Sequence, residues 1–127
     1  MGKKNILSFM MMAKETALSK NNCRIFLLGA VGVRYDGAIV KSLNSPTQVT
    51  DRTAHAEYKL ARKLGYNATI YVARIRRDDG QFAMARPCFA CRKLLISKRT
   101  LKVYYTINHS QYGVWNPLLD TDSVYQF

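Results

Sequence analysis

The chain has 127 residues, a length that allows one domain and is too short for two. Twenty Lys and Arg residues against eight Asp and Glu residues give a net charge of +12, which favours an acidic partner such as a nucleotide phosphate, a nucleic-acid backbone or an anionic surface. No stretch is long and apolar enough to be predicted as a membrane-spanning segment.

The first half of the chain is predicted to contain two helices that flank a strand hairpin. Ile6, Met10, Ala13 and Ala17 recur at helical spacing and would share one buried face. The predicted elements are a helix over 4–19, a buried strand from Cys23 to Val33, a returning strand from Ala38 to Ser42, and a helix from near His55 through Lys63.

The second half alternates strand and helix patterns. Pro87 stands where a helix entry favours it, and β-branched residues mark the strands. The predicted elements are a strand from Thr69 to Arg76, a short helix from Cys88 to about Ser97, a strand from Leu101 to Asn108, a last strand at Gly113 to Trp115, and an irregular tail over 116–127.

This order of elements predicts an α/β protein, a three-layer α/β/α domain over residues 1–127 with a five-stranded mixed sheet. Only a few residues, around His109 to Tyr112, separate the last two strands. That gap is too short for a crossover helix, so the last strand should run antiparallel as a hairpin.

The chain has three cysteines, two of which form Cys88-x-x-Cys91. A disulfide-stapled domain of this size would need more cysteines in even number, so the pattern favours a reduced metal or redox site and an intracellular, reducing location, cytoplasmic or otherwise. Cys23 lies in an apolar strand and is predicted to be a core residue.

Cys88 and Cys91 are three residues apart at a predicted helix start, which places both thiols on one face. The positive end of the helix favours thiolates, and thiolates suit zinc. A third ligand would come from His55 or His109. Three protein ligands leave one position open for water, and that position distinguishes a catalytic zinc from a structural one.

Glu57 lies two residues after His55 at the start of the same predicted helix. A carboxylate at that position can reach a zinc-activated water without binding the metal. It could then take the water's proton and pass it to a leaving nitrogen. These parts suit the hydrolytic removal of an amine from an aromatic ring.

A histidine-x-glutamate pair followed by Pro-Cys-x-x-Cys is a pattern of zinc nucleobase deaminases. The sequence resembles the cytidine deaminase-like superfamily, in particular its CMP/dCMP-type domain, over roughly residues 5 to 115. The resembling segments are Leu28-Gly29-Ala30-Val31, Asp36-Gly37, Asn44, Thr53-Ala54-His55-Ala56-Glu57, Arg86-Pro87-Cys88-Phe89-Ala90-Cys91 and Lys102-Val103-Tyr104-Tyr105-Thr106.

The resemblance implies a role for each matching residue. His55, Cys88 and Cys91 would hold Zn²⁺, and Glu57 would be the general acid and base. Three further contacts concern the substrate: the Ala56 N–H would meet the base carbonyl, Asn44 the sugar, and the Arg86-Pro87 peptide region the base amine. Tyr104 and Tyr105 alternate faces of a strand, so one should be core, and Tyr105 is predicted to face the substrate.

The substrate is predicted to be a cytosine-containing anion, converted to its uracil counterpart. The charge of +12 exceeds what a single nucleotide phosphate requires, which favours cytosine in single-stranded nucleic acid over free CMP or dCMP. Adenine stays open, because Thr53 to Glu57 also looks like the tRNA adenosine deaminases, although the short last hairpin argues against that branch. An oligomer is possible, since family members are often oligomeric.

Two other interpretations of the motifs remain. Cys88-x-x-Cys91 alone would fit a thioredoxin-like redox pair, but that leaves His55 and Glu57 unexplained. A non-catalytic nucleic-acid-binding module would need a fourth ligand to close the zinc tetrahedron, such as Cys23 or His109.

The basic residues form three groups in the sequence. They could hold a nucleic-acid backbone or form a solvated rim around a single phosphate. They are Lys59, Arg62 and Lys63 on one predicted helix, Arg74, Arg76 and Arg77 along a strand and turn, and Arg92, Lys93, Lys98, Arg99 and Lys102 after the two cysteines.

Overall fold

The structure is a computed structural model that describes residues 3–18, 26–43, 56–76 and 78–127. Its elements are α1 (Lys3–Leu18), β1 (Phe26–Val33), β2 (Ile39–Leu43), α2 (Ala56–Leu64), β3 (Thr69–Arg76), β4 (Phe82–Ala83), α3 (Phe89–Ser97), β5 (Lys102–Thr106), β6 (Gln111–Asn116) and β7 (Thr121–Gln126). None of the described helices is long and apolar enough to cross a membrane.

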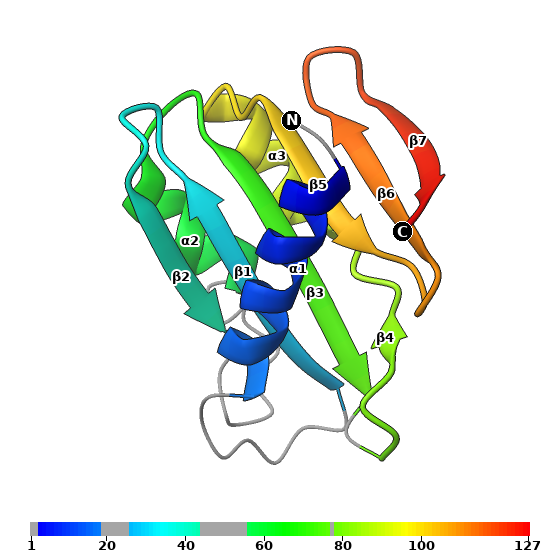
Figure 1. Cartoon of the computed structure of the whole chain (residues 1–127). Helices are drawn as coiled ribbons and strands as arrows, with labels where there is room; N and C mark the ends of the chain where they lie inside the picture. Colours follow the sequence, from blue (N-terminus) through cyan, green and yellow to red (C-terminus); the bar gives the residue numbers. More distant parts are fainter. Residues whose placement is uncertain (1–2, 19–25, 44–55, 77) are drawn as a thin grey trace.

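One mixed sheet runs through the middle of the molecule, with helices on both faces (Figure 1). The strand order is β2-β1-β3-β5-β6-β7, and β4 pairs with β3 beside this path. Only β3 and β5 are parallel, because α3 lies in the connection between them; every other pair is antiparallel. The predicted three-layer fold is therefore confirmed, as is the antiparallel last hairpin of β5 and β6.

The predicted strand count and the predicted tail are both wrong. The sheet has seven strands instead of five, since β4 and β7 were not expected. Residues 116–127 are not irregular, because Thr121–Gln126 forms β7 against β6. The β7 strand is an edge strand exposed along its whole length, so it needs no alternation of apolar residues, and β4 has only two residues.

The first face of the sheet is covered by α1, which packs on β1 and β3. The four residues expected on its buried face, Ile6, Met10, Ala13 and Ala17, are all buried. At Gly29 the approach is so close that a Cβ would collide with the backbone of α1 at Ala13 and Ala17. Glycine is therefore required there for the helix to lie on the sheet.

The second face carries α2 and α3, which contact each other. Leu60 and Leu64 of α2 and Leu95 of α3 share one core cluster with Tyr105 and Trp115. Tyr104, the neighbour of Tyr105, lies in the cluster on the α1 face, so the predicted alternation of the two tyrosines is confirmed. The chemistry-bearing segments Ala56–Leu64 and Phe89–Ser97 thus belong to the same layer.

Candidate active site

Two helix starts supply the backbone of the predicted site. Ala56 and Glu57 are the first two residues of α2, where the sequence predicts them. Their side chains lie outside the described residues, as do His55 and Asn44 entirely. Cys23, expected in the core, is likewise outside them. The predicted roles of these residues stay predictions.

Cys88 and Cys91 lie at the start of α3. Cys88 is the N-cap, with extended backbone angles (φ −68°, ψ 166°), and Cys91 follows in the first turn. Pro87 is buried immediately before them. The Cys88 residue is exposed, Cys91 is buried, and neither is in a disulfide.

This arrangement fits a zinc ion in its donor chemistry. Both cysteines lie within the first turn of one helix, where the helix dipole and the N–H groups that the first turn leaves unsatisfied stabilise thiolates. The described residues alone contain no group of three or more possible metal ligands. A complete ligand set therefore requires a residue from outside them, which His55 would supply. The other candidate, His109, is exposed in the turn between β5 and β6.

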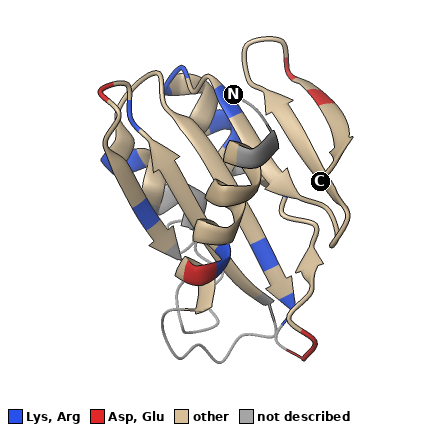
Figure 2. Ribbon diagram, viewed as in Figure 1, with Lys and Arg blue, Asp and Glu red and all other residues tan. Residues whose placement is uncertain are grey.

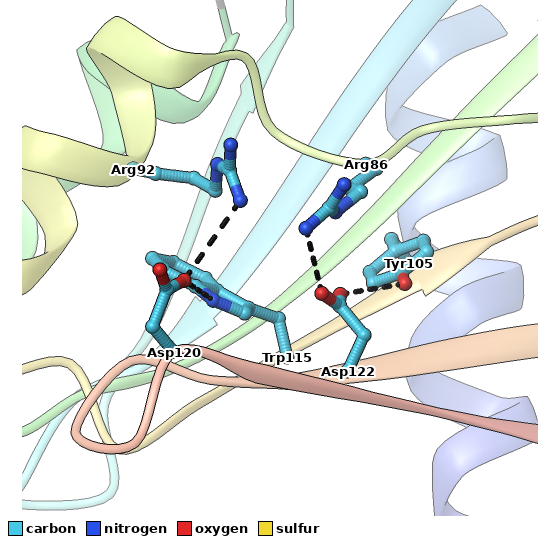
Figure 3. A network of polar contacts seen from close by, with 6 residues as sticks. All are labelled: Arg86, Arg92, Tyr105, Trp115, Asp120 and Asp122. Atoms are coloured by element: carbon cyan, nitrogen blue, oxygen red, sulfur yellow. Dashed lines mark hydrogen bonds and ion pairs between the residues drawn. The ribbon is translucent and has the colours of Figure 1, made fainter.

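Arg86 and Tyr105, both predicted to contact substrate, meet at one carboxylate (Figure 3). The Arg86 Nη2 lies 2.7 Å from Asp122 Oδ2, and the Tyr105 hydroxyl donates to Asp122 Oδ1 at 2.8 Å. Asp122 belongs to β7, opposite Trp115 in the β6–β7 register. The structure thus joins Arg86, just before the cysteine pair, to the last strand of the sheet.

The Tyr105 hydroxyl is held in its protonated form. Burial raises the pKa of Tyr105 to about 12, and the hydrogen bond to Asp122 and the negative charge of Asp122 add to this effect. The positive charges of Arg86 and Arg92 act in the opposite direction. At neutral pH the hydroxyl therefore remains a hydrogen-bond donor to Asp122.

A second aspartate of the same hairpin contacts α3. Asp120 lies 3.8 Å from the Nη1 of Arg92 and accepts a 2.9 Å hydrogen bond from the indole N–H of Trp115. The Arg92 guanidinium also lies over the Trp115 ring, 5.9 Å from its centroid. Arg92 is one turn after Cys88, so these contacts connect the hairpin to the helix that bears both thiols.

The aspartates at 120 and 122 were missed by the sequence reasoning. They fall in the segment expected to be irregular, and nothing near them resembles the deaminase motifs. The sequence held one signal, since Asp120 and Asp122 are two of only eight acidic residues in a chain of net charge +12.

The fold is similar to those of solved deaminases. A dCMP deaminase from the cyanophage S-TIM5 matches with a TM-score of 0.58 and 21% identity, covering 84% of this chain and 86% of that chain. A cytidine deaminase from Burkholderia pseudomallei matches with a TM-score of 0.55 and 19% identity, covering 99% of this chain and 93% of that chain. A cytidine deaminase from Mycobacterium tuberculosis matches with a TM-score of 0.53 and 19% identity, covering 84% of this chain and 85% of that chain. At these identities the likeness establishes the fold.

No curated protein matches the chain in sequence. The family described as the cytidine and deoxycytidylate deaminase zinc-binding region matches residues 3–107. The match covers most of the chain and includes both motifs, and its description names zinc as the metal. This chain therefore belongs to the cytidine and deoxycytidylate deaminase family of zinc-dependent enzymes.

Proposed function

We propose that this protein hydrolyses cytosine to uracil within single-stranded nucleic acid. Zinc would be held by His55, Cys88 and Cys91, and it would supply Lewis-acid activation of water when bound. The support is the family membership together with the two thiols at the start of α3.

Glu57 moves the protons in this proposal. Its carboxylate takes a proton from the water whose oxygen bonds to C4 of cytosine, and it delivers a proton to the amine nitrogen. The C4–N bond then breaks, and ammonia leaves with uracil as the other product. The Ala56 N–H and the Arg86-Pro87 peptide region orient the base, and Asn44 holds the sugar.

The distribution of charge supports a polyanionic substrate. Each described aspartate forms an ion pair with an arginine, and these arginines are Arg34, Arg76, Arg86 and Arg92. Six other cations on α2, on α3, in the segment after α3 and at the start of β5 form no ion pair with a described carboxylate; they are Arg62, Lys63, Lys93, Lys98, Arg99 and Lys102. Figure 2 shows the acidic residues mainly at the strand turns and on the β6–β7 hairpin.

Free dCMP or cytidine is the second candidate substrate class. It is favoured by the names of the similar structures, which are dCMP and cytidine deaminases. A mononucleotide would need a cation aimed at its one phosphate. Among the described residues, Arg86 and Arg92 flank the cysteine pair in sequence, and each already forms an ion pair, with Asp122 and Asp120 respectively, which favours the polynucleotide.

The test compares an oligonucleotide containing one cytosine with free dCMP, each incubated with the zinc-loaded protein and with Glu57→Gln. We expect uracil in the oligonucleotide, no turnover by Glu57→Gln, and one equivalent of zinc in both proteins. Glu15→Gln is the matched control, because Glu15 is the only other glutamate and is exposed on α1. Turnover of dCMP alone would reject the polynucleotide, and full activity of Glu57→Gln would reject the mechanism.

A further inference from the structure

The outer face of α3 carries exposed aromatic and basic side chains side by side. Cys91 and Leu95 point inward and are fully buried, whereas Phe89 is 67% exposed at the first helical position, directly after Cys88. Lys93 follows four residues later on the same face, with its Nζ 5.1 Å from the centre of the Phe89 ring. An exposed phenyl ring and a lysine therefore stand beside the cysteine pair.

The same pairing recurs at the other end of α3. The Nζ of Lys98 lies 5.3 Å from the centre of the Tyr66 ring, which is 60% exposed in the turn after α2. Arg99 follows Lys98 and is exposed. We call these residues together, Phe89, Lys93, Lys98, Arg99 and Tyr66, the α3 strip.

A groove continues the α3 strip at its far end. It has a volume of about 560 Å³ and is lined by Ile96, Arg99 and Leu101, and by Leu118 of the β6–β7 turn. Asn67, Thr100, Asn116 and Pro117 also line it. Apolar walls with a few polar residues and one cation suit a nucleobase with an adjoining phosphate.

We infer that the α3 strip and this groove bind the single-stranded polynucleotide that flanks the target base. Phe89 would stack on the base next to the target, the cations would contact phosphates, and the groove would take a base farther along. Stacking rings beside a row of cations is the general solution for binding single strands without sequence preference. The inference rests on the proposed function and specifies where its substrate lies.

The length of α3 sets the scale of this contact. Its nine residues extend about 14 Å at 1.5 Å per residue. At the spacing of about 3.4 Å per stacked nucleotide, that length corresponds to about four nucleotides. Oligonucleotides that extend at least this far on one side of the cytosine should be preferred over shorter ones.

The test is a pair of double variants with equal loss of charge. Lys93→Gln/Lys98→Gln removes two cations of the strip, while Lys14→Gln/Lys41→Gln removes two from α1 and β2. The first readout is the ratio of kcat/KM for a single-cytosine 15-mer to that for dCMP, in DNA and RNA of the same sequence. The second is the anisotropy of a labelled oligo(dT) 15-mer over a salt series, which reports binding without turnover.

We expect the strip variant to lower the ratio and the oligo(dT) affinity roughly tenfold and to reduce the slope of log affinity against log salt by about 1.4. The control variant should keep both near the parent values. If the parent protein deaminates oligonucleotides but the two double variants lower the ratio and the affinity equally, the binding role of the α3 strip is wrong, while the proposed function stands. If the parent neither binds nor deaminates any oligonucleotide, the proposed substrate class itself is wrong.

A second copy of the chain is the other occupant that could cover Phe89. Analytical sedimentation of the parent and of Phe89→Ser distinguishes a second copy of the chain from the polynucleotide as the occupant of this surface. A change from dimer to monomer, with oligo(dT) affinity unchanged, would show an interface between copies and reject the strip. Unchanged sedimentation with weaker oligo(dT) binding would support it.

Discussion

Asp122 is bound by Arg86 and Tyr105, two residues that the sequence predicts to contact the substrate. Arg86 is 43% exposed and Asp122 25%, so solvent weakens this ion pair, and it contributes at most about 1 kcal/mol to stability. The Tyr105 hydroxyl is more buried, and its hydrogen bond to a carboxylate is worth about 1.5–3 kcal/mol. The more important consequence is geometric, because Arg86 immediately precedes Pro87 and the cysteine pair.

We expect Asp122→Asn to lower kcat/KM for the preferred substrate several-fold. Asparagine keeps an oxygen that can accept from Tyr105 but loses the charge that orients Arg86, so the free energy of unfolding should fall by only about 1 kcal/mol. Kinetics and urea denaturation measure the two effects, and zinc content should not change.

Asp36→Asn is the control for this substitution. It breaks the ion pair of Asp36 with Arg34, which joins two exposed side chains, at the β1–β2 turn. The control should leave turnover at the parent level. If Asp122→Asn also had parent kinetics, Asp122 would contribute to packing alone and not to positioning Arg86.

At the scale of elements, the close contact of α1 with β1 depends on glycine at one position. Gly29 faces α1, and its missing Cβ is what allows the helix backbone to approach. Gly32 is on the same strand but faces α2, where the atoms nearest to a Cβ would all belong to the side chain of Leu64. A side chain can change rotamer, whereas a helix backbone must move as a whole.

Gly29→Ala should therefore destabilise the protein more than Gly32→Ala. The first forces α1 away from the sheet, at a cost of about 3 kcal/mol or more, and the second costs about 1 kcal/mol through repacking of Leu64. Urea denaturation of the two variants measures the difference. Equal losses, or a larger loss for Gly32→Ala, would contradict the close packing of α1 on β1.

The elements that the sequence predicts well are those with an apolar side to bury. The strand Thr69–Arg76 has the predicted bounds because its β-branched and aromatic residues are buried on both faces of the sheet, and α1 follows the spacing of its buried residues. The strand β7 has no such face, since it pairs through its backbone along the edge of the sheet. Its contribution to the site, Asp122, depends on that pairing and so could not be found from local pattern.

At the scale of the whole molecule, the proposed zinc ligands come from two distant parts of the chain. His55 precedes α2, and the two cysteines start α3, with β3 and β4 between them in the sequence. A metal bound to all three would hold the two helices of one layer together. The folded state would then bind zinc far more tightly than the unfolded chain, so zinc would stabilise the fold.

Removing zinc with a chelator should therefore lower the Tm of the protein by roughly 15 °C. A metal present at about a thousand times its Kd contributes about 4 kcal/mol, and each kcal/mol corresponds to several degrees for a chain of this size. Zinc, but not Mg²⁺, should restore the Tm, because thiolates and imidazole do not suit Mg²⁺. Differential scanning calorimetry with and without chelator measures the shift.

The two histidines of the chain provide matched variants for this experiment. His55→Ala should have a low Tm that the chelator barely changes, since one of three ligands is lost. His109→Ala should keep the full shift, because His109 is exposed in the β5–β6 turn. The reverse result would make His109 the third ligand, and a parent Tm that the chelator does not change would mean that zinc does not hold α2 and α3 together.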